Sequence, residues 1–248
     1  MIYRSNLVAP DLTSYFPFLH SRVMGHSFGH DVLSDWADKA DDDPVFGEYK
    51  QCGLWTHDEA AILSNIAPQV QGDWLDIGAH TGWTAAHIAE SCGPVTVTLV
   101  DPILKYQVFQ DRMEANLRNV WDVLNAIHGI TSEQFFARST FKHWHGIVID
   151  GDHHPGEPLK DAKGAIRFLK PDGVILFHDF VGLPVQEAVR WLMDEHGMSV
   201  RLYLTPHVVA CCWRGKFIPP KHEPDPALVA LQLWKRWPEM DWEPYFNL

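Results

Sequence analysis

The alternation of short apolar runs with amphipathic helical patterns is the feature that most limits how this chain can fold. The five runs of strand type are residues 73–77, 95–100, 123–128, 146–150 and 173–177. Strands separated by helical segments indicate a parallel sheet with helices on both faces. Two further runs, 199–204 and 207–213, are too close for a crossover and must pair antiparallel. We therefore predict a doubly wound α/β fold with a seven-stranded sheet, mostly parallel, ending in an antiparallel hairpin.

The segments on either side of this alternation lack a sustained period. We expect residues 1–55 to form an N-terminal extension that caps the main domain. Regularity begins at Thr56, which together with Glu59 three residues later has the pattern of a helix capping box. The main domain then spans 56–214, and a Pro-rich tail with one short helix around 226–235 occupies 215–248.

Charge and composition exclude several classes of partner. The 20 basic and 32 acidic residues give a net charge of −12, which disfavours a nucleic-acid partner. The start of the chain lacks a signal-peptide pattern, and no apolar run approaches the ~20 residues that span a bilayer. The four cysteines form no C-x-x-C pair, so we expect reduced thiols. These observations predict a cytoplasmic protein with a small-molecule partner and no membrane partner, and the appended termini are consistent with a homodimer.

The loop after the first strand run has the form of a ligand-binding turn. It reads DIGAHTG over 76–82, and a helical pattern follows at once. Gly78 and Gly82 allow sharp turns and the close approach of a ligand, in the crevice where the carboxyl ends of parallel strands meet. The loop lacks the middle glycine of the dinucleotide fingerprint G-x-G-x-x-G. The Asp76 carboxylate would also repel a pyrophosphate, whereas it suits a ligand ammonium group.

A second carboxylate stands where a ribose would be bound. Asp101 ends the second strand run, at the separation from the glycine loop that suits a carboxylate accepting both ribose hydroxyls. A ligand with an amino group and a ribose, but without a diphosphate, fits both the loop and Asp101.

These features resemble the class I S-adenosylmethionine-dependent methyltransferases, over residues from about 56 to 213. The resemblance implies a Rossmann-like sheet and S-adenosylmethionine as the cofactor. It also implies that the loop cradles the methionine part, that Asp101 holds the ribose, and that His128 lies near the adenine. The residues assigned to the cofactor are Asp76, Gly78, Ala79, His80, Thr81, Gly82, Asp101, His128 and Asp150.

Two polar strings follow the fourth and fifth strand runs, IDGDHH at 149–154 and HD at 178–179. They resemble a subfamily with DGDH and HD motifs, similar to catechol-type and macrolide-sugar O-methyltransferases, which bind a divalent metal at these positions. The resemblance implies a metal site made by Asp150, His178 and Asp179; alternatively, these residues hold the acceptor directly. Mg²⁺ prefers oxygen ligands, so the imidazole shifts the preference toward Mn²⁺, Fe²⁺ or Zn²⁺.

The catalytic residues that we predict are His153, Asp150 and His178. His153 stands where catechol methyltransferases carry a catalytic lysine, and an imidazole is suited to removing a hydroxyl proton near neutral pH. Asp152 is a candidate for orienting His153. The predicted reaction is O-methylation of a small molecule, whose pocket we expect from the N-terminal extension and residues 180–186.

Two other functions are weighed against this hypothesis. A nicotinamide-dependent oxidoreductase is disfavoured by the missing middle glycine and by Asp76. A non-catalytic module that binds the cofactor is disfavoured because Asp150, His153, His178 and Asp179 are all present. Trp83, Trp144 and Trp191 are candidates for lining an aromatic acceptor pocket, but ordinary packing is the expected role of each.

Overall fold

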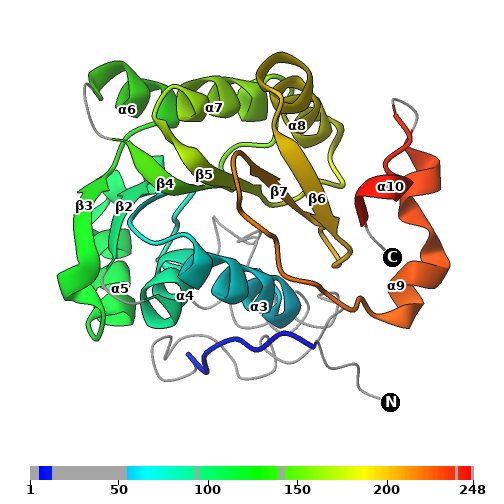
Figure 1. The fold of residues 1–248 in the computed structure, drawn as a ribbon. Helices are drawn as coiled ribbons and strands as arrows, with labels where there is room; N and C mark the ends of the chain where they lie inside the picture. The colour runs from blue at the N-terminus through cyan, green and yellow to red at the C-terminus, as the bar shows by residue number, and fades with distance from the viewer. Residues whose placement is uncertain (1–5, 13–54, 93–94, 140–142, 238–239, 247–248) are drawn as a thin grey trace, which may run out of the picture.

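A single sheet with helices on both faces forms the centre of the protein (Figure 1). The computed structural model describes residues 6–12, 55–92, 95–139, 143–237 and 240–246, so most of the predicted N-terminal extension lies outside the described residues. The strand order is β3-β2-β1-β4-β5-β7-β6. The strands are β1 (Asp73–Ile77), β2 (Thr96–Val100), β3 (Leu124–His128), β4 (Trp144–Ile149), β5 (Leu169–Phe177), β6 (Ser199–Tyr203) and β7 (Val209–Trp213).

The pairing of the strands confirms the predicted fold. β1 to β5 are mutually parallel, whereas β7 runs antiparallel to both β5 and β6. The strand bounds agree closely with the apolar runs except for β5, which begins at Leu169 rather than at residue 173. The extra residues are reached through a register irregularity between β4 and β5, which an apolar run cannot reveal.

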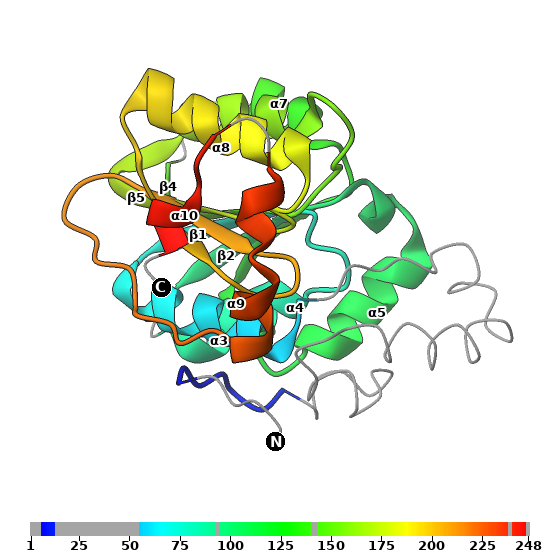
Figure 2. The same ribbon diagram turned by 90° about the vertical axis from the view of Figure 1, so that its right-hand side faces the viewer.

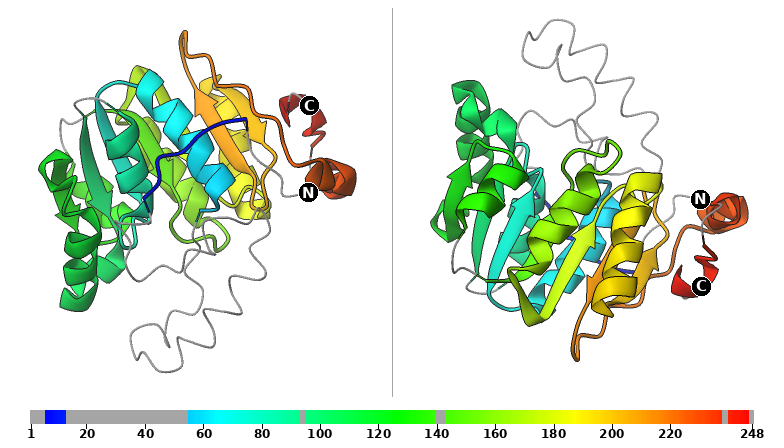
Figure 3. Two further views of the ribbon diagram at one scale, coloured as in Figure 1. Left: turned by 90° about the horizontal axis from the view of Figure 1, so that it is seen from below. Right: turned by 90° about the horizontal axis from the view of Figure 1, so that it is seen from above.

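The helices form one layer on each face of the sheet (Figures 1 and 3), with α3, α4 and α5 on one side and α6, α7 and α8 on the other. The helices of these layers are α3 (His57–Ile66), α4 (Trp83–Ser91), α5 (Gln107–Leu117), α6 (Ser132–Arg138), α7 (Glu157–Ile166) and α8 (Leu183–His196). Two buried apolar clusters fill the spaces between the sheet and the two layers. Trp83 and Trp144 are buried in these clusters and serve packing, as expected.

The short helices connect and extend this framework. The 3₁₀ helices are η2 (Ala67–Gln69), η3 (Pro102–Lys105), η4 (Trp121–Val123) and η5 (Leu233–Arg236), and the tail carries α9 (Pro226–Leu231) and α10 (Glu243–Phe246). No helix in the described part of the chain combines the length and the apolar character needed to cross a membrane.

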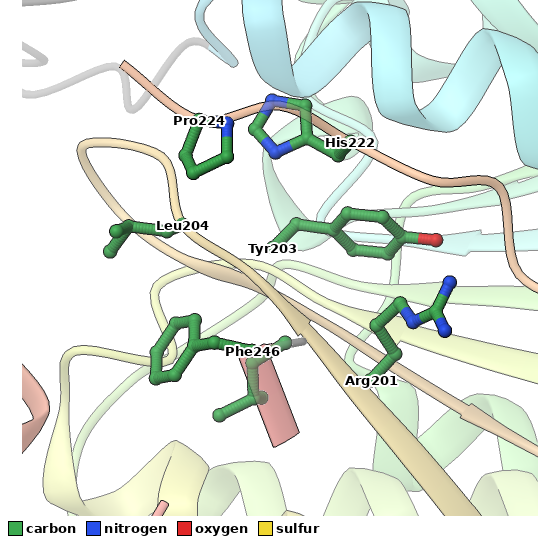
Figure 4. A pocket seen from close by; sticks show the side chains of 7 residues that line it. Arg201, Tyr203, Leu204, His222, Pro224 and Phe246 are labelled. Carbon is green, nitrogen blue, oxygen red and sulfur yellow. The ribbon is translucent and has the colours of Figure 1, made fainter. Parts of the chain in front are cut away.

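The tail is tied to the edge of the sheet and to α3 (Figures 2 and 4). Arg201 on β6 donates to the carbonyl of Pro219 at 2.8 Å, and the Tyr203 hydroxyl donates to that of Pro220 at 3.1 Å. His222 of the tail lies 3.0 Å from the carboxylate of Asp58 in the first turn of α3. The polar side chains of Arg201, Tyr203 and His222 around the small pocket in Figure 4 therefore form hydrogen bonds that hold the tail in place.

The described N-terminal residues 6–12 run across α3, as Figure 3 shows. The Asn65 side chain on α3 donates to the carbonyl of Val8 at 2.9 Å. The Asn6 amide group pairs with the tail, donating to Lys221 O at 3.1 Å and accepting from Glu223 N at 2.8 Å. The N-terminal residues 6–12 and the tail segment around residues 221–223 thus meet beside α3.

Candidate active site

The site residues predicted from the sequence come together where β1, β2, β4 and β5 end. Parallel strands present their carboxyl ends at one edge, so loops far apart in the sequence meet there. The predicted cofactor loop (residues 76–82) begins at the end of β1, Asp101 follows β2, and Asp150 and His178 follow β4 and β5. The turn between β6 and β7 reaches the same edge, because Val181 N donates to His207 O at 3.3 Å.

Asp76 is fully buried at the end of β1, and half of its carboxylate has no partner. Its Oδ2 accepts a short hydrogen bond from the Thr84 hydroxyl, while Oδ1 has no hydrogen-bond partner among the described residues. Burial, together with the charges of Asp150 and Asp101, raises the pKa of Asp76 to about 7. A buried acceptor without a donor is costly, so this oxygen is suited to a ligand that brings a proton donor or a positive charge.

Asp101 is fixed by two backbone donors. Its Oδ1 accepts from Ile103 N at 2.9 Å, and its Oδ2 accepts from His80 N at 2.9 Å. A carboxylate offers about four acceptor positions, so each oxygen can still receive another hydrogen bond. The second bond also ties the end of β2 to the cofactor loop, where His80 adopts a left-handed backbone conformation with φ of 44°.

The glycines of the loop make room for the protein itself, and not only for a ligand as the sequence suggested. Gly78 has φ of 83°, and a Cβ there would lie 2.0 Å from the carbonyl oxygen of Asp150. A Cβ on Gly82, with φ of 94°, would lie 2.5 Å from the side chain of Leu117. Gly78 therefore allows the cofactor loop to pack directly against the loop that carries Asp150.

Replacing Gly78 with alanine should lower the free energy of unfolding by about 2–4 kcal/mol. The alanine would have to adopt a left-handed conformation, and its Cβ would clash with the backbone of Asp150. Gly156 is a matched control, since its φ is 86° but nothing lies within 4 Å of a Cβ built there. Gly156→Ala should cost only the conformational part, about 1–2 kcal/mol. Urea unfolding of both variants measures the difference, and equal losses would contradict the proposed clash.

His128 lies at the end of β3, on the same edge as Asp101. The His128 carbonyl accepts from Asp101 N at 3.1 Å, and its ring centroid lies 5.0 Å from that of Phe135. Partial burial lowers the pKa of His128, which favours a neutral imidazole at this edge. A neutral ring at this edge is suited to contact with an aromatic ligand group.

Asp150, His178 and Asp179 form a compact cluster, as the sequence predicted. The His178 Nδ1 atom lies 3.2 Å from Asp150 Oδ1 and 3.1 Å from Asp179 Oδ2. One donor atom from each of the three residues lies within 4.8 Å of the others, a spacing that a metal ion can bridge. Burial alone would lower the pKa of His178, but the charges of Asp150 and Glu59 raise it well above the ordinary value.

His153 lies on the open side of this cluster. Its Nε2 atom is 3.7 Å from Asp150 Oδ1 and 3.6 Å from Asp179 Oδ2, and its side chain is 36% exposed. The neighbouring His154 is 84% exposed and pairs with Asp152 through a short side-chain contact. Asp152 therefore contacts His154, whereas the ion-pair contacts of His153 in the described part of the chain are with Asp150 and Asp179.

Three further residues belong to the cluster and were not predicted as functional. The Trp55 indole N–H donates to Asp150 Oδ2 at 2.8 Å, and its ring stacks on His178 with centroids 4.9 Å apart. Glu59 Oε2 lies 3.1 Å from His178 Nε2, and Glu59 Oε1 accepts from His207 N at 3.1 Å. Burial alone would raise the pKa of Glu59, but His178 and His207 hold it well below the ordinary value.

Strained backbone flanks the cluster on both sides. Asp179 has φ of 54° and Val208 has φ of 58°. A left-handed conformation is costly for a β-branched residue and persists only where the surroundings enforce it. Here Phe180 N donates to Val208 O at 3.0 Å, which joins the loop after β5 to the turn between β6 and β7.

Comparisons with known proteins agree with this architecture. Residues 75–180 match a family model described as a methyltransferase domain. No curated protein matches the sequence.

Three solved structures illustrate the similarity of fold. The O-methyltransferase TomG from Streptomyces achromogenes, solved with SAM, is 14% identical with a TM-score of 0.54, covering 75% of this chain and 90% of its own. A candidate caffeoyl-CoA O-methyltransferase from Staphylococcus aureus is 16% identical with a TM-score of 0.56, covering 75% and 98%. The cofactor-bound protein Rv0187 from MTB is 13% identical with a TM-score of 0.56, covering 84% and 99%.

At these identities the solved structures establish the fold alone. The family match covers residues 75–180, from β1 to the residues after β5. Residues 75–180 are therefore similar to a methyltransferase domain, and the sheet around them has the Rossmann-like fold of solved methyltransferases.

Proposed function

We propose that this chain transfers a methyl group from S-adenosylmethionine to a hydroxyl oxygen of a small molecule, assisted by a divalent metal ion. The observation that carries the proposal is the position of the His153 imidazole, 3.6–3.7 Å from the Asp150 and Asp179 carboxylates. A half-exposed base beside two acceptor groups can receive a hydroxyl and remove its proton. TomG is an O-methyltransferase by its description, but likeness to it supports only the fold, so the preference for oxygen rests on His153.

The cofactor loop is suited to a positively charged ligand. The charges of Asp101 and Asp150 act on buried Asp76, so three carboxylates at this edge favour a cation over an anion. S-adenosylmethionine supplies an electrophilic methyl group on a sulfonium ion. The unpartnered Oδ1 of Asp76 would accept from the ligand ammonium, and Asp101 would accept from the ribose hydroxyls. A nicotinamide dinucleotide carries a negatively charged pyrophosphate, which these three carboxylates would repel.

The donor set of Asp150, His178 and Asp179 fits a divalent metal ion. The His178 Nδ1 atom lies 3.1–3.2 Å from one carboxylate oxygen of Asp150 and one of Asp179. A bound metal ion would polarise the acceptor hydroxyl and favour its ionised form. The His153 Nε2 atom, 3.6–3.7 Å from the two carboxylates, would take the proton of the acceptor hydroxyl. Holding the acceptor oxygen in line is the largest contribution that this chain can make, worth effective molarities of about 10⁵–10⁸ M.

Calorimetric titration with S-adenosylmethionine tests the proposal, once with chelated protein and once with added Mn²⁺ or Zn²⁺. One-to-one binding, followed by methylation in a screen of phenols, catechols and sugar hydroxyls, would support it. Binding without turnover on any hydroxyl would favour the non-catalytic alternative. The absence of binding under every condition would remove the cofactor assignment.

The affinity for S-adenosylmethionine should depend on pH through Asp76. In the free protein the pKa of Asp76 is about 7, and a bound ammonium group favours the charged carboxylate and so lowers that pKa. The affinity should therefore rise as the pH increases from 5.5 to 7, by up to about tenfold per pH unit, and level off above 7. Asp76→Asn should bind more weakly at pH 7.5 and show no such rise. A wild-type affinity that does not change over this range would contradict the role of Asp76.

A further inference from the structure

Glu59 is a buried carboxylate that the proposed reaction does not use. It lies in the first turn of α3, where it forms a capping box with Thr56. Thr56 N donates to Glu59 Oε2 at 2.7 Å, while His207 N donates to Oε1 at 3.1 Å. Two backbone donors, one from each end of the domain, therefore fix the orientation of this carboxylate.

Capping alone does not require a charged residue at this position. A capping box works with Glu or Gln at its third position. The box that begins α6 uses Gln134 with Thr131, and its hydrogen bonds are exposed to solvent. The box of α3 instead buries a carboxylate, and a buried charge is costly unless it has partners. The partners are the rings of His178 and His207, at 3.1 and 3.2 Å.

The contact with Glu59 determines how the His178 ring presents its two nitrogens. An ionised carboxylate only accepts hydrogen bonds, so the Nε2 of His178 must carry the proton in this contact. The other nitrogen, Nδ1, then faces Asp150 and Asp179. The Trp55 ring stacks on the His178 ring with an interplanar angle of 14°, so this contact also restricts tilting of the imidazole.

We propose that Glu59 is a positioning residue that holds His178 as a nitrogen ligand and thereby makes the Asp150–His178–Asp179 cluster selective for a transition metal over Mg²⁺. This inference rests on the metal-assisted function proposed above and specifies which metal ions the cluster prefers. Histidine ligands of metals commonly donate their second N–H to a carboxylate, and loss of such a partner costs about 10–100-fold in metal affinity. Imidazole suits Zn²⁺, Fe²⁺ and related ions, whereas Mg²⁺ prefers oxygen ligands.

Metal titration of the chelated full-length protein tests the proposal. Visible absorption follows Co²⁺ binding, and competition with a chromophoric chelator gives the Zn²⁺ affinity. Wild-type protein should bind one Co²⁺ with absorption bands that indicate nitrogen ligation, and Zn²⁺ should bind far more tightly than Mg²⁺. Glu59→Gln keeps an acceptor for the capping box but removes the charge, and it should lower the Zn²⁺ affinity about 10–100-fold.

Two variants control for effects on folding. Thr56→Ala removes the cap hydroxyl that accepts from Glu59 N at 3.3 Å and should lower the melting temperature without changing the Zn²⁺ affinity. The double variant Glu59→Gln/His178→Asp removes the buried charge and supplies an oxygen ligand. It should lose Zn²⁺ affinity and gain Mg²⁺ affinity, which a merely misfolded site would not do.

The outcomes separate this proposal from the proposed function. If Glu59→Gln is folded and binds Zn²⁺ as tightly as the wild type, Glu59 does not position His178. If wild-type protein binds S-adenosylmethionine but shows no Co²⁺ bands, the metal inference is wrong while the cofactor assignment stands. If S-adenosylmethionine does not bind, the proposed function itself is wrong, whatever the metal titration shows.

Discussion

Asp101→Ala should weaken S-adenosylmethionine binding by about 10²–10⁴-fold in a calorimetric titration. The carboxylate is the proposed acceptor for two ribose hydroxyls, and each charge-assisted hydrogen bond contributes about 1.5–3 kcal/mol. The substitution also removes the 2.9 Å bond from His80 N that ties the cofactor loop to the end of β2. Both effects act on binding rather than on the methyl transfer step.

Two further variants separate the charge of Asp101 from its structural role. Asp101→Asn keeps an oxygen that can cap η3, so it should retain the fold and show an intermediate loss of affinity. Asp122→Ala removes an exposed carboxylate from η4 and should leave the affinity unchanged. A folded Asp101→Ala protein that binds S-adenosylmethionine normally would contradict the ribose assignment.

His153→Gln should lower kcat for O-methylation by about 10²–10⁴-fold while changing the cofactor affinity little. Glutamine can occupy the space beside Asp150 and Asp179, but it cannot take a proton from the acceptor. Single-turnover kinetics on an acceptor found by screening would measure the effect, and the loss should be smallest for acceptors that ionise most readily.

The adjacent histidine provides a matched control. His154 is 84% exposed and pairs with Asp152, so His154→Gln should stay within about threefold of the wild type. Equal losses in the two variants would indicate a disturbed loop rather than a missing base. Full activity in His153→Gln would transfer the role of proton acceptor to Asp150 or Asp179.

The sheet could be predicted from the sequence because its signals are local. Each strand of the parallel part is a short apolar run, and the Thr56–Glu59 capping box is visible in four consecutive residues. The loop of residues 76–82 and Asp101 could be proposed as a ligand site for the same reason, since each lies at the end of its strand. The adjacency of Asp150 and His178 then follows from the parallel arrangement, which places both strand ends at one edge.

The rest of the cluster depends on contacts that sequence distance conceals. Glu59 lies 119 residues from His178 and 148 residues from His207. The local pattern also accounted fully for Glu59 as a capping residue, so nothing in it pointed to a second role. The contact of Asp152 could not be predicted for a different reason. Two histidines follow Asp152 directly, and only the fold determines that it contacts His154.

His207 lies in the turn between β6 and β7, so it is synthesised after all the other residues of the site. During synthesis the cofactor loop, Asp101 and Asp150 all emerge before β6 and β7. The second of the two backbone donors to Glu59, His207 N, emerges only after every parallel strand is complete. A chain that ends before this turn would contain the loop of residues 76–82 but would lack the hydrogen bond from His207 N to Glu59 Oε1. We therefore expect a product that ends before this turn to lose the arrangement of the cluster around His178 before it loses the loop of residues 76–82.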